Sequence, residues 1–390
     1  MSFRIHRVVL RNYRSIAACD VRLGKLVFLV GPNGAGKNNF LDALRLVADG
    51  LRSTLDTAIR ERGGIGEVRR RSAGHPTHLD IEVAFTSGDS FGGTYGIGIA
   101  AQKGGGYEVS REECSVFDPT FHYFKRTAGR PVESSPSEPV LPVVGPDRLY
   151  LVTASSLPVF RPVYDGLTGM GFYNFNPDAV RIPQSPDPGE LLARDGRNLA
   201  AVVHRLGRYH PAVKARIEEY LGLIVPTIHG IDRVPLGPTE TLEFRQDVPG
   251  AAAPWRFTAG SMSDGTLRAL GVLVALFQQA PSPAVTSLIG IEEPEAALHP
   301  GAAGVLYDAL RYASDTRQVL VTSHSPDLLD NDDVSDVELL AVESRAGETV
   351  LGPIDEVSRR AVRERLYTPG ELLRLNQLSP GNHPPAALTG

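Results

Sequence analysis

The chain has 390 residues, with 45 acidic and 40 basic side chains and a formal charge of −5 at pH 7, which argues against a protein that wraps nucleic acid over its whole surface. Hydrophobic residues make up 42% of the sequence and charged residues 22%, values typical of a globular protein and too apolar for general disorder. Two distant cysteines, Cys19 and Cys114, support neither a disulfide framework nor a zinc site, and no apolar run approaches the roughly 18 residues of a membrane-spanning helix, so we expect a soluble cytoplasmic protein without membrane contact.

The first predicted elements surround a glycine-rich turn. Residues 3–10 alternate as a strand does, and residues 26–30 form the compact apolar run of a buried strand. A helix after the turn would place four apolar side chains on one face, those of Phe40, Leu44, Val47 and Leu51. An arginine-rich stretch at 52–71 separates this helix from another alternating strand at 78–85.

The middle of the chain has a different composition. Residues 126–147 are rich in Pro and Ser, which predicts an exposed loop or linker. Residues 148–250 combine an expected strand at 149–152 with expected helices at 199–206 and 212–221. We therefore expect residues 87–250 to form an accessory α/β lobe with insertions, between an N-terminal part at 1–86 and a C-terminal part at 251–390.

The C-terminal part has a regular pattern. It predicts a helix at 267–278, a strand at 287–291, a helix at 302–312, a strand at 318–322 and a hairpin at 337–351. Strands that alternate with helices of this length indicate an α/β fold with a mostly parallel central sheet, covered on both faces.

The turn after residues 26–30 fits the phosphate-binding pattern G-x-x-x-x-G-K. Its glycines let backbone N–H groups turn toward phosphate oxygens, and the lysine and the helix N-terminus supply positive charge. The alternative is an ordinary glycine-rich turn between a strand and a helix, which the later motifs disfavour. The candidate phosphate-binding residues are Gly31, Pro32, Asn33, Gly34, Ala35, Gly36, Lys37 and Asn38.

Asn38 stands where this pattern usually has Ser or Thr. A hydroxyl at this place helps to hold Mg²⁺, whereas an amide oxygen is an acceptable hard ligand that sits one bond farther out. We therefore expect Asn38 to serve the metal and hydrolysis of the nucleotide to be slow.

Three later motifs lie at ends of expected elements. Glu292 and Glu293 follow an apolar strand, where one carboxylate could serve Mg²⁺ and the other could activate water; a solvated strand end is the alternative. His324 follows the strand at 318–322, where it could bond a γ-phosphate or a water molecule, or be a plain turn histidine. Ser263 and Gly265 begin a helix that could receive an anion, although helix capping explains the serine alone.

In this order, the motifs resemble those of the RecF, SMC and OLD branch of the ABC-type ATPases, and in particular RecF-like AAA-family ATPases whose head has no long coiled coil. Residues 9–16 are similar to the opening strand and turn of that branch, and residues 31–38 match its Walker A motif apart from Asn38. Residues 263–266 resemble a degenerate signature motif, and residues 322–326 resemble the switch-histidine loop. Residues 289–295 resemble Walker B, with Glu292 where Asp is more common.

The resemblance implies a P-loop NTPase fold, the ABC-type ATPase head, which dimerises with ATP and Mg²⁺ between its subunits. It implies that Lys37 binds phosphate, that Asn38 and Glu292 are the metal ligands, and that Glu293 is the catalytic base. His324 would sense the γ-phosphate, Ser263 and Gly265 would close on the partner's nucleotide, and the nucleotide would also be lined by Arg14 and Asn39. A magnesium-linked glutamine is also implied, but residues 62–64, which occupy roughly the right region, contain no Gln.

Two functions follow as expectations. The first is an ATPase whose nucleotide-dependent homodimer acts on DNA, in repair, recombination or defence against foreign DNA. The alternative, which Asn38 favours, is a weakly hydrolysing, nucleotide-sensing module that controls a partner protein such as a nuclease. A conventional transporter ATPase is disfavoured, because the magnesium-linked glutamine is missing and the sequence has no recognisable membrane-docking feature.

DNA contact would need a local basic patch. Five arginines, Arg60, Arg62, Arg69, Arg70 and Arg71, could contact phosphates without regard to sequence. A solvated arginine-rich face is the alternative, and it is favoured because the whole chain has 35 Arg and only 5 Lys.

Overall fold

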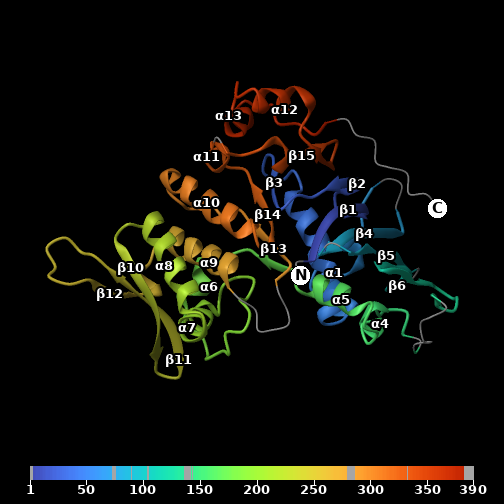
Figure 1. Ribbon diagram of the computed structural model, residues 1–390, viewed down its shortest axis with the longest axis horizontal. Helices are drawn as coiled ribbons and strands as arrows, with labels where there is room; N and C mark the ends of the chain where they lie inside the picture. The colour runs from blue at the N-terminus through green and yellow to red at the C-terminus, as the bar shows by residue number, and fades with distance from the viewer. Residues whose placement is uncertain are drawn as a thin grey trace. The chain divides into compact units, whose positions relative to one another are not determined.

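The structure of the chain is a computed structural model that describes residues 3–72, 76–88, 90–102, 105–135, 142, 144–278, 286–331 and 333–381 (Figure 1). The chain forms two compact units. The first consists of Met1–Met170, Ser335–Leu366 and Asn376–Gly390, and the second of Gly171–Val334 and Tyr367–Leu375. The expected accessory segment at 87–250 is thus divided, with residues 87–170 in the first unit and residues 171–250 in the second.

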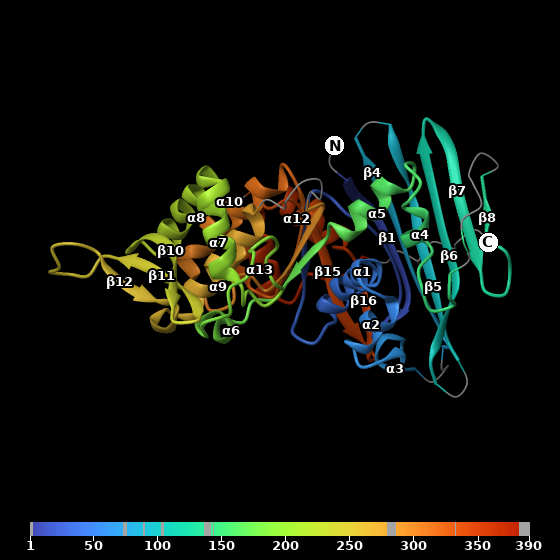
Figure 2. The ribbon, with the colours of Figure 1, turned by 90° about the horizontal axis from the view of Figure 1, so that it is seen from below.

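The first unit contains a mixed sheet with the strand order β8-β7-β6-β5-β4-β1-β2-β16-β15-β3. Neighbouring strands are antiparallel from β8 to β2 and between β16 and β15, whereas β2 with β16 and β15 with β3 are parallel. Figure 2 shows β5, β6 and β7 beside one another. The strands are β1 Phe3–Tyr13, β2 Ile16–Arg22, β3 Leu26–Val30, β4 His78–Ser87, β5 Phe91–Ala101, β6 Tyr107–Asp118, β7 Thr120–Thr127, β8 Glu133–Ser134, β15 Leu339–Arg345 and β16 Glu348–Pro353.

Side-chain alternation explains these strands. In β4 every second residue is buried, as the pattern at 78–85 predicts, whereas β3 is buried along its whole length, as its apolar run predicts. The expected hairpin at 337–351 is confirmed as β15 and β16. Of the expected loop at 126–147, the first residues end β7 and two residues form β8, while residues 136–141 and 143 lie outside the described residues.

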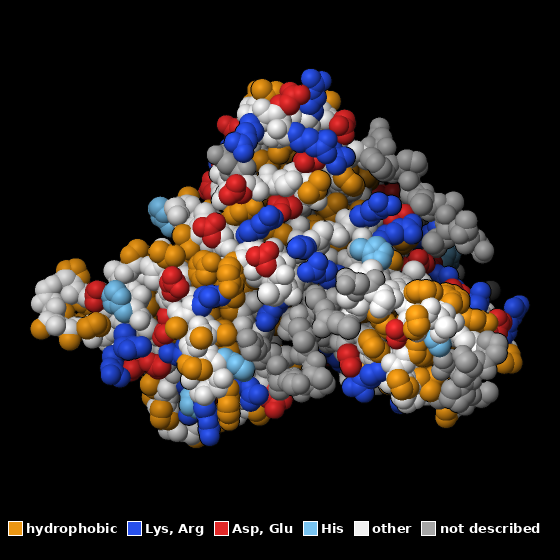
Figure 3. Space-filling view, viewed as in Figure 1, with side chains coloured by type: hydrophobic (Ala, Val, Ile, Leu, Met, Phe, Trp, Pro, Cys, Tyr) orange, Lys and Arg blue, Asp and Glu red, His pale blue; other side chains and the backbone are white. Residues whose placement is uncertain are grey.

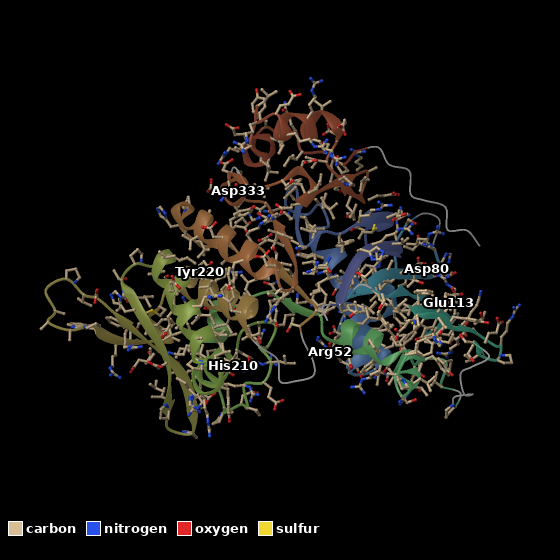
Figure 4. All side chains as sticks on the ribbon, viewed as in Figure 1. Arg52, Asp80, Glu113, His210, Tyr220 and Asp333 are labelled. Carbon is tan, nitrogen blue, oxygen red and sulfur yellow. The ribbon has the colours of Figure 1, made fainter. Side chains whose placement is uncertain are left out.

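Helix α1, Lys37–Arg52, follows β3 and buries the predicted apolar face of Phe40, Leu44, Val47 and Leu51. At its end, Arg52 donates to the backbone oxygen of Thr168, 2.7 Å away, which joins α1 to the end of α5 (Figure 4). The other helices of this unit are short: α2 Leu55–Arg60, α3 Ile65–Val68, α4 Leu151–Ala154, α5 Arg161–Thr168 and α12 Glu356–Arg363.

The expected strand at 149–152 is wrong, because helix α4 begins there at Leu151. The carboxylate of Glu112, which is fully buried, accepts hydrogen bonds from the backbone N–H groups of Tyr150 and Leu151. A carboxylate at the first turn stabilises a helix and satisfies N–H groups that would otherwise lack partners. This contact from a distant strand overrides the strand preference of the local apolar residues.

The second unit contains a parallel sheet in which β13, Leu288–Glu292, lies between β14, Gln318–Ser323, and β9, Gly171–Tyr173. Helix α9, Asp264–Phe277, is buried on nearly all sides, as expected of a helix that is apolar all round. A separate antiparallel sheet contains β10 Ile228–Leu236, β11 Thr239–Gln246 and β12 Trp255–Thr258. The remaining helices of this unit are α6 Pro177–Arg181, α7 Leu199–Tyr209, α8 Pro211–Ile224, α10 Ala303–Ser314, α11 Pro326–Leu329 and α13 Pro369–Arg374. Short 3₁₀ turns lie at Ala259–Ser261 and Pro300–Ala302 in this unit and at Asp336–Glu338 in the first unit.

Most predicted elements of the second unit are confirmed. The helices expected at 199–206, 212–221, 267–278 and 302–312 are α7, α8, α9 and α10, and the two expected strands are β13 and β14. The predicted α/β class is also confirmed. Within the described ranges, no helix combines the length and the apolar character that crossing a bilayer would require.

Candidate functional site

The glycine-rich loop of the first unit is packed against the β15–β16 hairpin. A Cβ atom on Gly31 would lie 2.0 Å from the backbone oxygen of Val342, and one on Gly36 would lie 2.0 Å from Oγ1 of Thr349. Gly36 also has a φ of 100°, which side-chain-bearing residues rarely adopt. These two glycines are therefore needed for close packing as well as for presenting N–H groups.

Lys37 lies in the first turn of α1 and is only 5% exposed. Its Nζ donates to the backbone oxygen of Gly31 at 2.8 Å and to that of Pro32 at 3.1 Å. Gly36, which precedes the helix, offers no side chain to cap it, so N–H groups of the first turn face the loop. A fixed cation beside an uncapped helix N-terminus is an arrangement that suits phosphate.

The predicted residue Asn39 lies behind the loop. Its Nδ2 donates to Oγ of Ser15 at 2.6 Å, and that hydroxyl lies 2.7 Å from Oγ1 of Thr349. Thr349 in turn donates to the backbone oxygen of Ala35 at 2.8 Å. This row of hydrogen bonds fixes the back of the loop to the hairpin, while Asn38 is exposed at the start of α1.

The predicted residue Arg14 pairs with an acid of helix α1. Its Nη2 lies 2.8 Å from Oδ2 of Asp42, in a turn where Arg14 has a positive φ of 47°. Asp42 is buried and also pairs with Arg45 at 2.8 Å and with Arg62 at 3.0 Å. The structure therefore places Arg14 in a cluster of ion pairs around a single carboxylate.

The arginine-rich stretch is largely engaged in contacts within the chain. Arg62 is a correction to the DNA-contact hypothesis, because its side chain is 1% exposed and pairs with Asp42 and Asp49. On the face that Figure 3 shows, Lys and Arg side chains likewise lie among Asp and Glu side chains. The remaining contacts are Arg60 with Asp56, Arg69 with the backbone oxygen of Pro76, Arg70 with Glu348 and Arg71 with Glu67.

Replacing Arg62 by alanine is expected to lower the free energy of unfolding by about 3 kcal/mol, because Asp42 would lose a buried partner. Urea denaturation of both proteins would measure the difference. Arg60→Ala is the matched control, since its side chain is 78% exposed and its ion pair should contribute about 1 kcal/mol or less. Equal losses in the two variants would contradict a structural role for Arg62.

Glu292, at the end of β13, has two partners in the second unit that the sequence did not indicate. Its Oε1 accepts from Nη2 of Arg194 at 2.6 Å, and its Oε2 accepts from Nδ2 of Asn174 at 3.0 Å. Asn174 directly follows β9, which pairs with β13. It is an amide beside the candidate metal carboxylate. The sequence pattern did not mark it, because its contact with Glu292 depends on the pairing of β9 with β13.

Glu293 and His324 lie together at the ends of β13 and β14. Nδ1 of His324 is 3.4 Å from Oε1 of Glu293, and the two side chains are 40% and 34% exposed. The backbone N–H of Glu293 donates to the backbone oxygen of Thr322 at 3.0 Å, which fixes the turn in which Glu293 has a φ of 46°. A carboxylate and an imidazole at this distance can share the work of holding and deprotonating a water molecule.

Ser263 caps helix α9, as the capping interpretation predicts. Its Oγ accepts from the backbone N–H of Thr266 at 3.2 Å. Gly265 is buried in the first turn, and a Cβ atom there would lie 2.3 Å from the backbone oxygen of Ala297. Gly265 is therefore needed where α9 approaches the segment that follows Glu293.

The residues predicted to serve Mg²⁺ lie in different units, Asn38 in the first and Glu292 in the second. Their oxygens are hard donors of the type that Mg²⁺ prefers. Among the residues that the structure describes, no group of three or more His, Cys, Asp and Glu side chains could hold a metal ion on its own.

Comparisons with known families and sequences agree with the predicted resemblance. Residues 26–130 and 194–330, more than half of the chain, match the family described as "AAA domain, putative AbiEii toxin, Type IV TA system". The DNA replication and repair protein RecF of Vibrio cholerae is 43% identical over 47 residues, which are 12% of this chain and 13% of that protein. RecF of Aliivibrio salmonicida is 32% identical over 108 residues, 27% of this chain and 26% of that protein. The chain thus matches about a quarter or less of these two curated relatives.

Solved structures show the same fold. The SMC head bound to the C-winged helix domain of ScpA has a TM-score of 0.53, with 15% identity over 89% of this chain and 96% of that chain. The Smc head domain from Pyrococcus furiosus, bound to the C-terminal domain of ScpA, has a TM-score of 0.51, with 11% identity over 93% and 99% of the two chains. At this identity the comparison establishes the predicted ATPase-head fold alone.

Proposed function

This chain belongs to the AAA-domain family whose profile it matches, a family of RecF- and SMC-like ABC-type ATPases, and from this premise we propose that it binds and hydrolyses ATP. The observation that carries the proposal is the loop itself. Two glycines packed against the β15–β16 hairpin, a buried lysine and an uncapped helix N-terminus form a site suited to a polyphosphate.

The proposed role of each residue follows from the chemistry of its side chain or backbone. The backbone N–H groups of the loop and Nζ of Lys37 would bind the phosphates of ATP, and Asn38 and Glu292 are the residues that would serve Mg²⁺. Bound Mg²⁺ neutralises charge on the phosphate oxygens. Glu293 orients the attacking water and accepts its proton, and His324 donates a hydrogen bond to the γ-phosphate.

Arg194 and Asn174 act on Glu292. By holding one oxygen each, they fix the direction of the carboxylate.

The proposed ATPase forms a nucleotide-dependent homodimer. In it, the Ser263 and Gly265 end of helix α9 closes on the nucleotide of the partner, and hydrolysis reopens the dimer. A free hydroxyl and N–H groups at a helix start can bind a γ-phosphate once Ser263 releases its own cap.

We further propose that the cycle acts on DNA, which is supported by the likeness to RecF, described as a DNA replication and repair protein. Defence against foreign DNA is the second biological setting. The alternative is a nucleotide-sensing module that controls a partner such as a nuclease, and the observation that favours it is Asn38 in place of a hydroxyl.

Steady-state ATP turnover with and without DNA tests the proposal. Turnover that DNA raises by about 3-fold or more would support an ATPase that acts on DNA. ATP binding with turnover that DNA does not change would support the sensing module, and the absence of ATP binding would contradict both. DNA affinity should also fall steeply with salt, because any contact is led by phosphates.

Replacing Asn38 by serine is expected to raise kcat by about 3-fold or more. The amide oxygen of Asn38 lies one bond farther from the backbone than a serine hydroxyl, so the hydroxyl would lie at the usual position of the metal ligand. Steady-state turnover at saturating ATP and Mg²⁺ would measure kcat. The control is Asn38→Ala, which removes the ligand and should lower kcat. Unchanged turnover in Asn38→Ser would contradict the view that Asn38 slows the reaction.

A further inference from the structure

Besides the contact between Nδ1 of His324 and Oε1 of Glu293, hydrogen bonds from the backbone and from a side chain join the loops of these two residues. The first is the backbone bond from Glu293 to Thr322. The second is a side-chain bond, in which Oγ of Ser323 donates to Oε1 of Glu295 at 2.5 Å. The same Oγ accepts from the backbone N–H of Ser325 at 3.1 Å, so one hydroxyl links Glu295 to both sides of His324.

Glu295 is an unusual residue to find at this point. It is only 9% exposed, and its Oε2 has no hydrogen-bond partner among the residues that the structure describes. Burial raises the pKa of this carboxyl above its ordinary value, while the bond from Ser323 works in the opposite direction. The neutral form of Glu295 therefore persists to a higher pH than that of an exposed glutamate.

Packing alone does not explain a carboxyl group here. An apolar side chain of similar volume would fill the same space without leaving a buried oxygen unpaired, which costs roughly 1–3 kcal/mol. The group that does have a partner is Oε1, and its partner lies directly before His324. The useful contact of Glu295 is thus the one with the histidine loop.

We propose that Glu295 is a positioning residue that acts through Ser323 to hold the loop of His324 against Glu293. This inference rests on the proposed hydrolysis of ATP for its effect on turnover, but the linkage itself is independent of nucleotide. Loss of the carboxyl frees Ser323, which loosens the N–H of Ser325 and lets the imidazole move away from Oε1 of Glu293.

The experiment compares Glu295→Ala with Glu295→Gln, a neutral side chain of the same shape. Hydrogen exchange without nucleotide is measured for the peptide 323–329, and kcat and KM for ATP are measured separately. In Glu295→Ala, exchange at the Ser325 amide should be about 10-fold faster, as expected for one lost hydrogen bond. Its kcat should fall about 10- to 100-fold, with KM for ATP within about 2-fold.

Glu295→Gln should keep both the exchange rate and kcat within about 3-fold of the original protein, because its amide oxygen still accepts from Ser323. Ser323→Ala should reproduce Glu295→Ala, and the double variant should be no worse than either single one. Ser323→Ala also tests the proposal if Glu295→Ala does not fold. The control is Glu240→Ala on β11, a glutamate 3% exposed in the same unit, which should leave exchange at 323–329 unchanged.

Each result decides the proposal. Unchanged exchange in Glu295→Ala, or equal losses in Glu295→Ala and Glu295→Gln, would overturn a neutral positioning role. A protein that hydrolyses no ATP yet shows the expected exchange pattern would overturn the proposed function and leave the linkage in place.

Discussion

Replacing Lys37 by alanine is expected to lower the affinity for ATP by about 100-fold or more. The reason is that Nζ of Lys37 is a buried cation at the loop, and each charge-assisted hydrogen bond to phosphate contributes about 1.5–3 kcal/mol. Isothermal titration with ATP and Mg²⁺ would measure the change. The rise in melting temperature that ATP gives the original protein should disappear in the variant.

Lys25→Ala is the matched control, because Lys25 is an exposed lysine of the same unit outside the loop. Its affinity for ATP should stay within about 2-fold of the original value. If Lys37→Ala retained the affinity of this control, the loop would not be the phosphate site and the proposed function would fail at its first step.

Replacing Glu293 by glutamine should reduce kcat by about 100-fold or more while ATP still binds. Glutamine keeps the shape and the contact distance to His324 but cannot accept the proton of the attacking water. With ATP trapped, the dimer should accumulate, which light scattering on a sizing column would detect.

The control for this variant is Glu343→Gln, a glutamate exposed to a similar degree that pairs with Arg345. It should leave both turnover and the fraction of dimer unchanged. Turnover at the original rate in Glu293→Gln would remove Glu293 from the role of base, and loss of ATP binding would instead assign it to the binding of nucleotide.

Local patterns predicted most of the fold because the elements around the site are long or uniformly apolar. The buried strand β3 and the helix α1 could be located from apolar spacing alone. Helix α4 could not, since its first turn depends on Glu112, a residue 38 positions earlier in the chain. A pattern within ten residues contains no information on such a partner.

Candidate residues could be selected from the sequence where a short motif combines residue types suited to one reaction. The glycine-rich loop with Lys37 is one such motif, and the neighbouring pair Glu292 and Glu293 is another. Arg194 and Asn174 were missed because what makes them notable is their contact with Glu292 across strands that are far apart in sequence. The burial of Arg62 was hidden for a similar reason, because an arginine among other arginines reads as exposed.

The hydrogen bond from Thr349 to Ala35 joins residues 314 positions apart, which bears on the order in which the protein can fold. At roughly 5–20 residues per second, Thr349 leaves the ribosome on the order of half a minute after the loop that it supports. During that time Gly31 and Gly36 have nothing to pack against, and the newly made N-terminal strands must wait for their C-terminal neighbours. Competence to hold a polyphosphate therefore arises only after residue 349 has been made.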